Sequence, residues 1–129
     1  MNSGYRYSWL SSFIILMVGL HSTTASATDG SNIGDTQMCI NSEHIIDTPV
    51  IDRKTILVKM LIPKDGYKRI DLVRNCSGLY EGNGFSYDTS LNKLCKQDLL
   101  FANGSAGSAC LIDQIVTIDK AEARRLIEK

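Results

Sequence analysis

The chain has 129 residues, and its 14 basic residues balance its 14 acidic residues. A chain without excess charge lacks the basic surface that nucleic-acid binding requires, and it has no electrostatic means of docking on an acidic membrane. We therefore expect no nucleic-acid partner.

Residues 1–27 have the pattern of a cleavable signal peptide. Arg6 supplies positive charge, residues 9–20 form an apolar core too short to span a bilayer, and residues 25–27 (ASA) make an A-x-A cleavage site. An uncleaved membrane anchor is the alternative, and the short apolar run disfavours it. Cleavage would leave 102 residues, enough for one domain, with 13 basic and 14 acidic side chains. We expect a periplasmic or secreted protein without stable membrane insertion after cleavage.

The first half of the remaining chain predicts a polar leader followed by short strands. Residues 28–38 are polar and contain glycine, so we expect a flexible leader with no fold of its own. Residues 39–50 predict one or two short strands. Residues 55–62 and 67–73 alternate with the two-residue period of a strand, and the Pro-Lys-Asp-Gly sequence between them favours a turn. These two segments therefore predict a β-hairpin.

The second half predicts an irregular segment, further strands and a terminal helix. Residues 75–94 are rich in glycine and asparagine, with one short strand expected at 85–87, and residues 99–102 predict another apolar strand. Residues 109–118 alternate again, and the pattern places four residues on one face: Cys110, Ile112, Val116 and Ile118.

Residues 119–129 predict a helix at the C-terminus. Asp119 is suited to the N-cap position, and Glu122 follows it three residues later, as in a capping box. Ala123, Leu126 and Ile127 form a thin apolar stripe that can dock on the sheet. The fold class predicted from all elements is mainly β, a small antiparallel barrel or rolled sheet of about five to seven short strands with a short C-terminal helix. Residues 39–129 would form this single domain.

Four cysteines remain after the signal peptide: Cys39, Cys76, Cys95 and Cys110. An even count in a short exported chain indicates two disulfides. A zinc site with four cysteine ligands is disfavoured because such sites use close cysteine pairs, and none is present. Of the three connectivities, we favour the nested one, in which Cys39 pairs with Cys110 and Cys76 pairs with Cys95 across the irregular segment. Closing that loop of about twenty residues would contribute about 3 kcal/mol.

Short motifs accompany the cysteines in a defined order: Cys39-Ile40, Val50-Ile51-Asp52, Asn75-Cys76-Ser77-Gly78-Leu79, Phe85-Ser86-Tyr87, Leu94-Cys95 with Asp98, and Cys110-Leu111-Ile112. In order and spacing, from Cys39 to Ile118, they resemble a family of small exported proteobacterial proteins classed as a domain of unknown function. The chain departs from that family at Ser77, where proline is frequent, and after Cys110, where glycine is frequent. The resemblance implies a periplasmic location and no known activity.

The sequence contains no recognisable catalytic, metal-binding or cofactor-binding set. His44 could act as a general base, but a surface histidine is the simpler interpretation. Asp52 with Arg53 is most simply a turn, and Asp98 is expected to cap a loop or pair with a base. We expect no cofactor and no enzymatic activity, with a weak carboxylate-dependent hydrolase as the remote alternative.

Three aromatic residues gather in the irregular segment, namely Tyr80, Phe85 and Tyr87. They could form a binding face for a sugar or a partner protein, or they could plug the mouth of a barrel. The leading hypothesis is a non-enzymatic accessory or binding protein whose partner is an envelope protein or a small envelope ligand. A secreted inhibitor or immunity protein against an envelope-directed enzyme is the alternative, which would need an exposed, rigid loop within residues 80–92. The oligomeric state stays open.

Overall fold

The computed structural model describes residues 33–62, 66–89, 91–103 and 108–129. The expected signal peptide and most of the expected leader lie outside these residues. The described part is mainly β, with a short helix at the C-terminus, and the predicted fold class is confirmed. Two disulfides are present, the number expected from the four cysteines.

The described residues form nine strands, a 3₁₀ turn and one α-helix. In chain order these elements are β1 (Thr36–Gln37), β2 (Cys39–Asn41), η1 (Ser42–His44), β3 (Ile45–Asp47), β4 (Thr55–Met60), β5 (Tyr67–Leu72), β6 (Phe85–Tyr87), β7 (Lys93–Cys95), β8 (Leu99–Ala102), β9 (Ala109–Ile118) and α1 (Lys120–Ile127).

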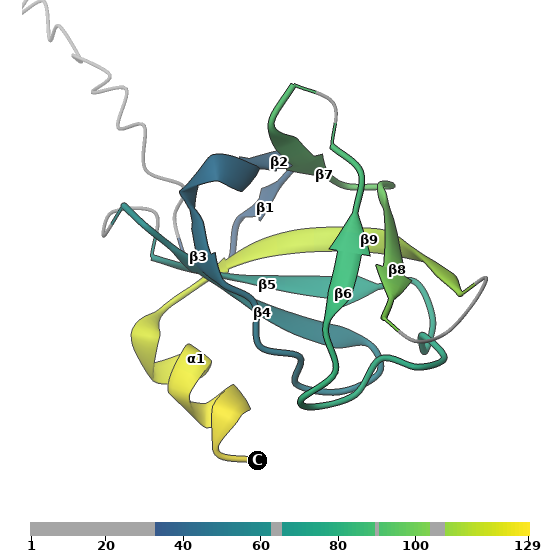
Figure 1. Ribbon diagram of the computed structural model, residues 1–129. Helices are drawn as coiled ribbons and strands as arrows, with labels where there is room; N and C mark the ends of the chain where they lie inside the picture. The colour runs from purple at the N-terminus through teal and green to yellow at the C-terminus, as the bar shows by residue number, and fades with distance from the viewer. Residues whose placement is uncertain (1–32, 63–65, 90, 104–107) are drawn as a thin grey trace, which may run out of the picture.

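One curled antiparallel sheet makes up most of the molecule. Its strand order is β3-β4-β5-β9-β8-β6, and β1 pairs with β9 on the same edge as β8. Strands β8 and β6 run across the direction of β4 and β5, so the sheet closes about half of a barrel (Figure 1). Strands β2 and β7 form a separate two-stranded ladder beside it.

The predicted hairpin is present as β4 and β5. Ile56 lies opposite Ile70, and Lys59 lies opposite Tyr67. Gly66 has φ of 53°, a left-handed conformation that glycine adopts without steric cost, which explains its place in the turn. The rest of the turn, residues 63–65, lies outside the described residues.

A β-bulge in β9 corrects the expected alternation of that strand. Leu72 lies opposite Ile112, whereas the preceding Asp71 lies opposite Gln114, so Asp113 is an extra residue. The bulge reverses which face each later residue occupies. Ile112 and Ile115 therefore both face the interior, and the prediction that Val116 and Ile118 share a face with Ile112 was wrong.

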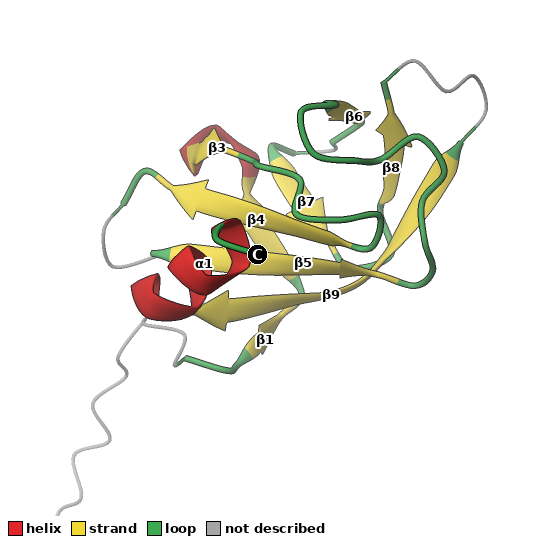
Figure 2. Cartoon of the chain, turned by 90° about the horizontal axis from the view of Figure 1, so that it is seen from below, coloured by secondary structure: helices red, strands yellow, loops and turns green. Residues whose placement is uncertain are grey.

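Two hydrophobic clusters lie on opposite faces of the sheet. The inner cluster fills the half-barrel with aliphatic residues of β4, β5, β8 and β9, such as Ile56, Ile70 and Leu100. The outer cluster joins Leu57 and Val116 of the sheet to the helix α1. Figure 2 shows α1 lying across β4, β5 and β9, at the end of the sheet away from β8.

The helix begins where the sequence predicts. The backbone N–H of Glu122 donates to Asp119 Oδ1 over 2.6 Å, which makes Asp119 the N-cap. The Glu122 carboxylate accepts from Arg69 Nη1 over 2.8 Å, and Arg69 Nε also donates to Asp71 over 3.0 Å. Burial acts to lower the pKa of Arg69, but the hydrogen bonds and charges of Asp71 and Glu122 outweigh it, so the pKa is raised. This charged cluster ties the helix to the outer face of β5.

The cysteines pair differently from the nested prediction, which was wrong. Cys39 bonds to Cys95, because β2 and β7 pair with these two residues directly opposite each other. Cys76 bonds to Cys110 at the start of β9. Cys39 cannot reach Cys110, because the chain before it pairs near the far end of β9, where Thr36 lies opposite Val116.

Part of the expected leader is also ordered. Residues Thr36–Gln37 form β1, and the chain just before them is held by two backbone hydrogen bonds with Thr117, which donates to the Asp35 carbonyl and accepts from the Gly34 N–H. The edge of β9 beyond β8 is open to this segment, so the two can pair there. The polar composition of the segment gives no indication of a strand. In the part of the chain that the structure describes, no helix has the length and apolar character needed to cross a membrane.

Candidate functional site

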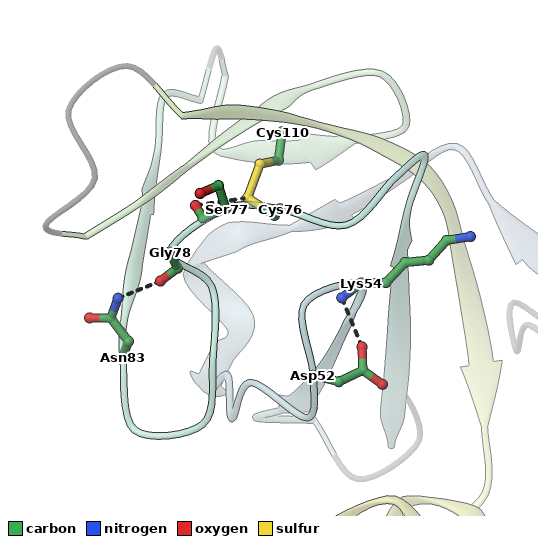
Figure 3. Close-up of a disulfide and its surroundings, with 7 residues drawn as sticks. All are labelled: Asp52, Lys54, Cys76, Ser77, Gly78, Asn83 and Cys110. Carbon is green, nitrogen blue, oxygen red and sulfur yellow. Dashed lines mark hydrogen bonds between the residues drawn. A yellow bond between two sulfur atoms is a disulfide. The ribbon is translucent and has the colours of Figure 1, made fainter.

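The polar residues singled out in the sequence serve the backbone. Asp52 Oδ1 accepts from the Lys54 N–H over 2.8 Å, which closes the turn before β4 (Figure 3). Asp98 Oδ2 accepts from the Cys95 N–H over 2.7 Å, as predicted for a loop cap. The Arg53 carbonyl accepts from the Cys76 N–H over 2.7 Å. These contacts account for the carboxylates of Asp52 and Asp98 as structural groups, and the two side chains serve separate turns, one before β4 and one before β8.

His44 ends the 3₁₀ turn η1 and is half-buried. Its backbone carbonyl accepts from the Leu61 N–H over 2.6 Å, and its side chain borders a small cavity that is also lined by Lys68. Among the described residues, no three histidine, cysteine, aspartate or glutamate side chains gather closely enough to hold a metal ion.

The three aromatic residues do not share an exposed face. Phe85 and Tyr87 lie opposite Ala102 and Leu100 of β8, so their rings turn inward with these buried residues. The two ring centroids lie 6.0 Å apart, and both rings pack partly buried against the inner cluster. Tyr80 is exposed in the preceding loop. Phe85 and Tyr87 therefore cover the core at the β6 edge, which is the plugging role weighed for them above.

The structure instead leaves a different apolar surface uncovered. Leu99 and Leu111 lie directly opposite each other on β8 and β9, and Phe101 follows Leu99 on the same face. Val73 joins them, because its N–H donates to the Leu111 carbonyl over 3.0 Å. These four side chains, which we call the β8–β9 face, are each 37–45% exposed. Contiguous exposed apolar side chains of this kind are typical of interaction sites.

A groove of about 510 Å³ runs beside the β8–β9 face. Its lining includes Val73, Leu99 and Leu111, and among the described residues that line it Arg74 is the one charged side chain. A volume of this size is in the range of sites that hold a ligand or a few partner side chains. The groove therefore combines an apolar wall with a single positive charge.

The second disulfide forms part of the groove lining. Cys110 and the Ser77 next to Cys76 both line the groove, and the bond between the two cysteines is buried (Figure 3). Nearby, Asn83 Nδ2 donates to the Gly78 carbonyl over 2.5 Å and to the Asn103 carbonyl over 2.8 Å. The disulfide holds the loop after β5 against the start of β9, and the bond to Asn103 holds the same loop against the end of β8, so this side of the groove is braced.

One signal in the sequence points to the β8–β9 face. Residues 99–102 (LLFA) are apolar at every position, so whichever face of that strand is buried, apolar side chains remain on the other, and these are Leu99 and Phe101 if Leu100 and Ala102 are buried. An alternating strand would have had polar residues there. Val73 and Leu111 carry no such signal, because their place beside Leu99 depends on pairing between distant segments.

No family model, no curated protein and no solved structure matches this chain. The family resemblance of the cysteine frame therefore stays a prediction.

Proposed function

We propose that this protein is an exported, non-enzymatic binding domain that holds a partner protein on its β8–β9 face. One observation carries the proposal: α1 covers the outer surface of the sheet at one end, whereas Leu99, Phe101 and Leu111 stay uncovered at the other end. The exposed parts of these side chains lie outside both hydrophobic clusters and are available to a partner.

The charge at the groove indicates what the partner presents. Arg74 stands beside the apolar wall formed by Leu99 and Leu111. A guanidinium recognises a carboxylate through two parallel hydrogen bonds, and desolvation by surrounding apolar groups strengthens such a pair. The expected partner is therefore a protein segment that combines apolar side chains with a carboxylate. The disulfide beside the groove supports this use, because a rigid site loses less entropy on binding.

Site-specific photo-crosslinking from the full-length protein in cells tests this proposal. A photoreactive residue at position 101 should capture one defined partner, and the same residue at the exposed Lys59 on β4 should not. Leu111→Lys and Arg74→Glu should each reduce that capture at least tenfold. Exchange of the partner's carboxylate for a basic residue should restore binding to the Arg74→Glu variant. Equal capture from both positions, or capture unchanged by Leu111→Lys, would refute the proposal.

A second candidate is an inhibitor of an envelope-directed enzyme, favoured by the turn after β6. Leu91 is 89% exposed, and it and Asn92 have φ of 59° and 56°. Asn92 is anchored on η1, because its carbonyl accepts from the Ser42 N–H over 2.9 Å and its Nδ2 donates to Glu43 over 2.7 Å. An apolar tip on an anchored turn can insert into an active-site cleft.

A panel of lysozymes and amidases tests the second candidate. If the turn inserts into an enzyme, Leu91→Ala should weaken inhibition at least tenfold, and the matched Leu99→Ala should not. Absence of inhibition across the panel excludes those enzymes as targets, and stronger loss from Leu99→Ala would favour the β8–β9 face instead.

A further inference from the structure

The two disulfides hold different parts of the fold. Cys76 and Cys110 are buried members of the inner cluster, so their bond lies within the core. Cys39 and Cys95 are both half-buried, and they close the two-stranded ladder of β2 and β7, which is separate from the main sheet. A thiolate must reach a sulfur atom to break a disulfide, so the bond in the ladder is the more accessible of the two.

The ladder fastens residues 88–96, which follow β6 and contain β7, and which we call the β7 loop. Among the described residues of this loop, Leu94 is the one buried side chain, and it lies opposite Ile40 of β2. The chain after the loop is fixed separately, because the Gln97 N–H donates to the Ile112 carbonyl over 2.9 Å. With a single buried side chain, the loop depends on the covalent bond for much of its attachment.

The packing around β2 is also incomplete. The small cavity bordered by His44 has a volume of about 130 Å³, and its lining includes Cys39 and Ile40 of β2 together with Gln37 and Lys68. Side chains beside a cavity lack the van der Waals contacts that close packing would supply. The β2 side of the ladder is therefore held less firmly than a strand within the core.

From these features, we infer that the bond between Cys39 and Cys95 is a redox-sensitive latch on the β7 loop. A dithiol reductant opens this bond while the bond between Cys76 and Cys110 stays closed. The β7 loop then detaches from β2, and the main sheet stays folded. Local opening of this kind is expected where a segment has few buried contacts of its own.

The exchange reaction balances within the protein and the dithiol. One thiolate of the dithiol attacks a sulfur atom of the bond, which forms a mixed disulfide and expels the other cysteine as a thiolate. The second thiol of the reductant then breaks the mixed disulfide and releases the remaining cysteine. Two electrons pass from the dithiol, which becomes a disulfide, and its two protons end on Cys39 and Cys95.

The latch controls how firmly the exposed Leu91 is presented, because this residue lies at the turn of the same loop. The inference does not depend on the proposed function, since none of the residues of the β8–β9 face belongs to the ladder.

Hydrogen–deuterium exchange of the purified protein, expressed from the full-length sequence, tests the inference across a series of ratios of reduced to oxidised dithiothreitol. Alkylation and peptide mapping report each bond. We expect half-reduction of the bond between Cys39 and Cys95 at a ratio at least tenfold lower than that of the second bond. Between the two ratios, amides of residues 88–96 should exchange at least tenfold faster, and those of β4, β5 and β9 should change less than twofold. Half-reduction of both bonds at one ratio, or equal acceleration throughout the sheet, would overturn the inference.

Two double variants separate the roles of the bonds without reductant. Cys39→Ala with Cys95→Ala should reproduce the faster exchange of residues 88–96 and leave β4 and β5 protected. Cys76→Ala with Cys110→Ala, the matched control, should instead accelerate exchange in β9 and in the loop after β5. A latch variant that exchanges like the wild type in residues 88–96, or that loses protection throughout the main sheet, would contradict the inference.

Discussion

Two adjacent leucines on β8 provide a direct test of the exposed face. Leu100 is 1% exposed and belongs to the inner cluster, whereas Leu99 is 45% exposed and belongs to the β8–β9 face. Leu100→Ala removes buried methyl groups and leaves a cavity, which costs about 3–5 kcal/mol of unfolding free energy. Leu99→Ala removes groups that water already reaches, so we expect a cost of roughly 1 kcal/mol or less.

Urea unfolding of the oxidised protein, followed by circular dichroism, measures both costs under the same conditions. Thermal unfolding of the same variants is a second measurement. For a domain of this size, Leu100→Ala should lower the thermal midpoint by more than about 10 °C, and Leu99→Ala by only a few degrees. The wild-type strand contains both residues, so each variant is the other's control. Equal destabilisation by the two variants would mean that both faces of β8 are buried, and the proposed binding face would then not exist.

Three further predictions concern the disulfides, the bulge and the helix. Mild reductant followed by alkylation and peptide mapping should label Cys39 and Cys95 first, because their disulfide is half-buried and the other is buried; labelling in the reverse order would contradict this. Deletion of Asp113 removes the extra residue and leaves every other residue of β9 on its present face, so we expect a loss of less than about 2 kcal/mol in urea unfolding, and a loss of more than about 3 kcal/mol would contradict the register. A double-mutant cycle of Arg69→Met and Glu122→Gln should give a coupling of about 1 kcal/mol that falls in high salt, and zero coupling would mean that the pair does not fasten the helix.

The elements with strong local signals were predictable from the sequence. The hairpin follows from two alternating segments around a Pro-Lys-Asp-Gly turn, and the helix start follows from Asp119. In these cases the residues that determine the structure lie within a few positions of one another. Local propensity and the final fold therefore agree.

The elements that depend on distant pairing were not predictable. Strand β7 lies in a turn-rich segment and forms because β2 pairs with it, so the bond between Cys39 and Cys95 could not be read from spacing. The bulge at Asp113 leaves no local sign in an otherwise alternating strand, yet it decides where Val116 points. One inserted residue reverses the faces of everything that follows, which is why alternation alone fails there.

The residues around the candidate sites also differ in whether the sequence predicts their positions. Lys68 had a usable signal, since it shares the two-residue period of Ile70 and Leu72 and had to face the interior with them. Gln37 had none, because its position at the cavity depends on the pairing of β1 with β9. Aromatic composition drew attention to Phe85 and Tyr87, but the register with β8 turns these rings toward the core.

The order in which the cysteines occur along the chain has a consequence for biosynthesis. The two disulfides interleave along the chain. Cys76 lies between Cys39 and Cys95 in the sequence, and Cys95 lies between Cys76 and Cys110. The chain is synthesised from its N-terminus, so Cys39 and Cys76 are both exposed to oxidation before their partners, Cys95 and Cys110, have been made. Early oxidation can therefore form a non-native bond between Cys39 and Cys76. Such a bond must be exchanged before the sheet closes. Maturation of this small protein should therefore be limited by thiol–disulfide exchange and accelerated by a disulfide isomerase.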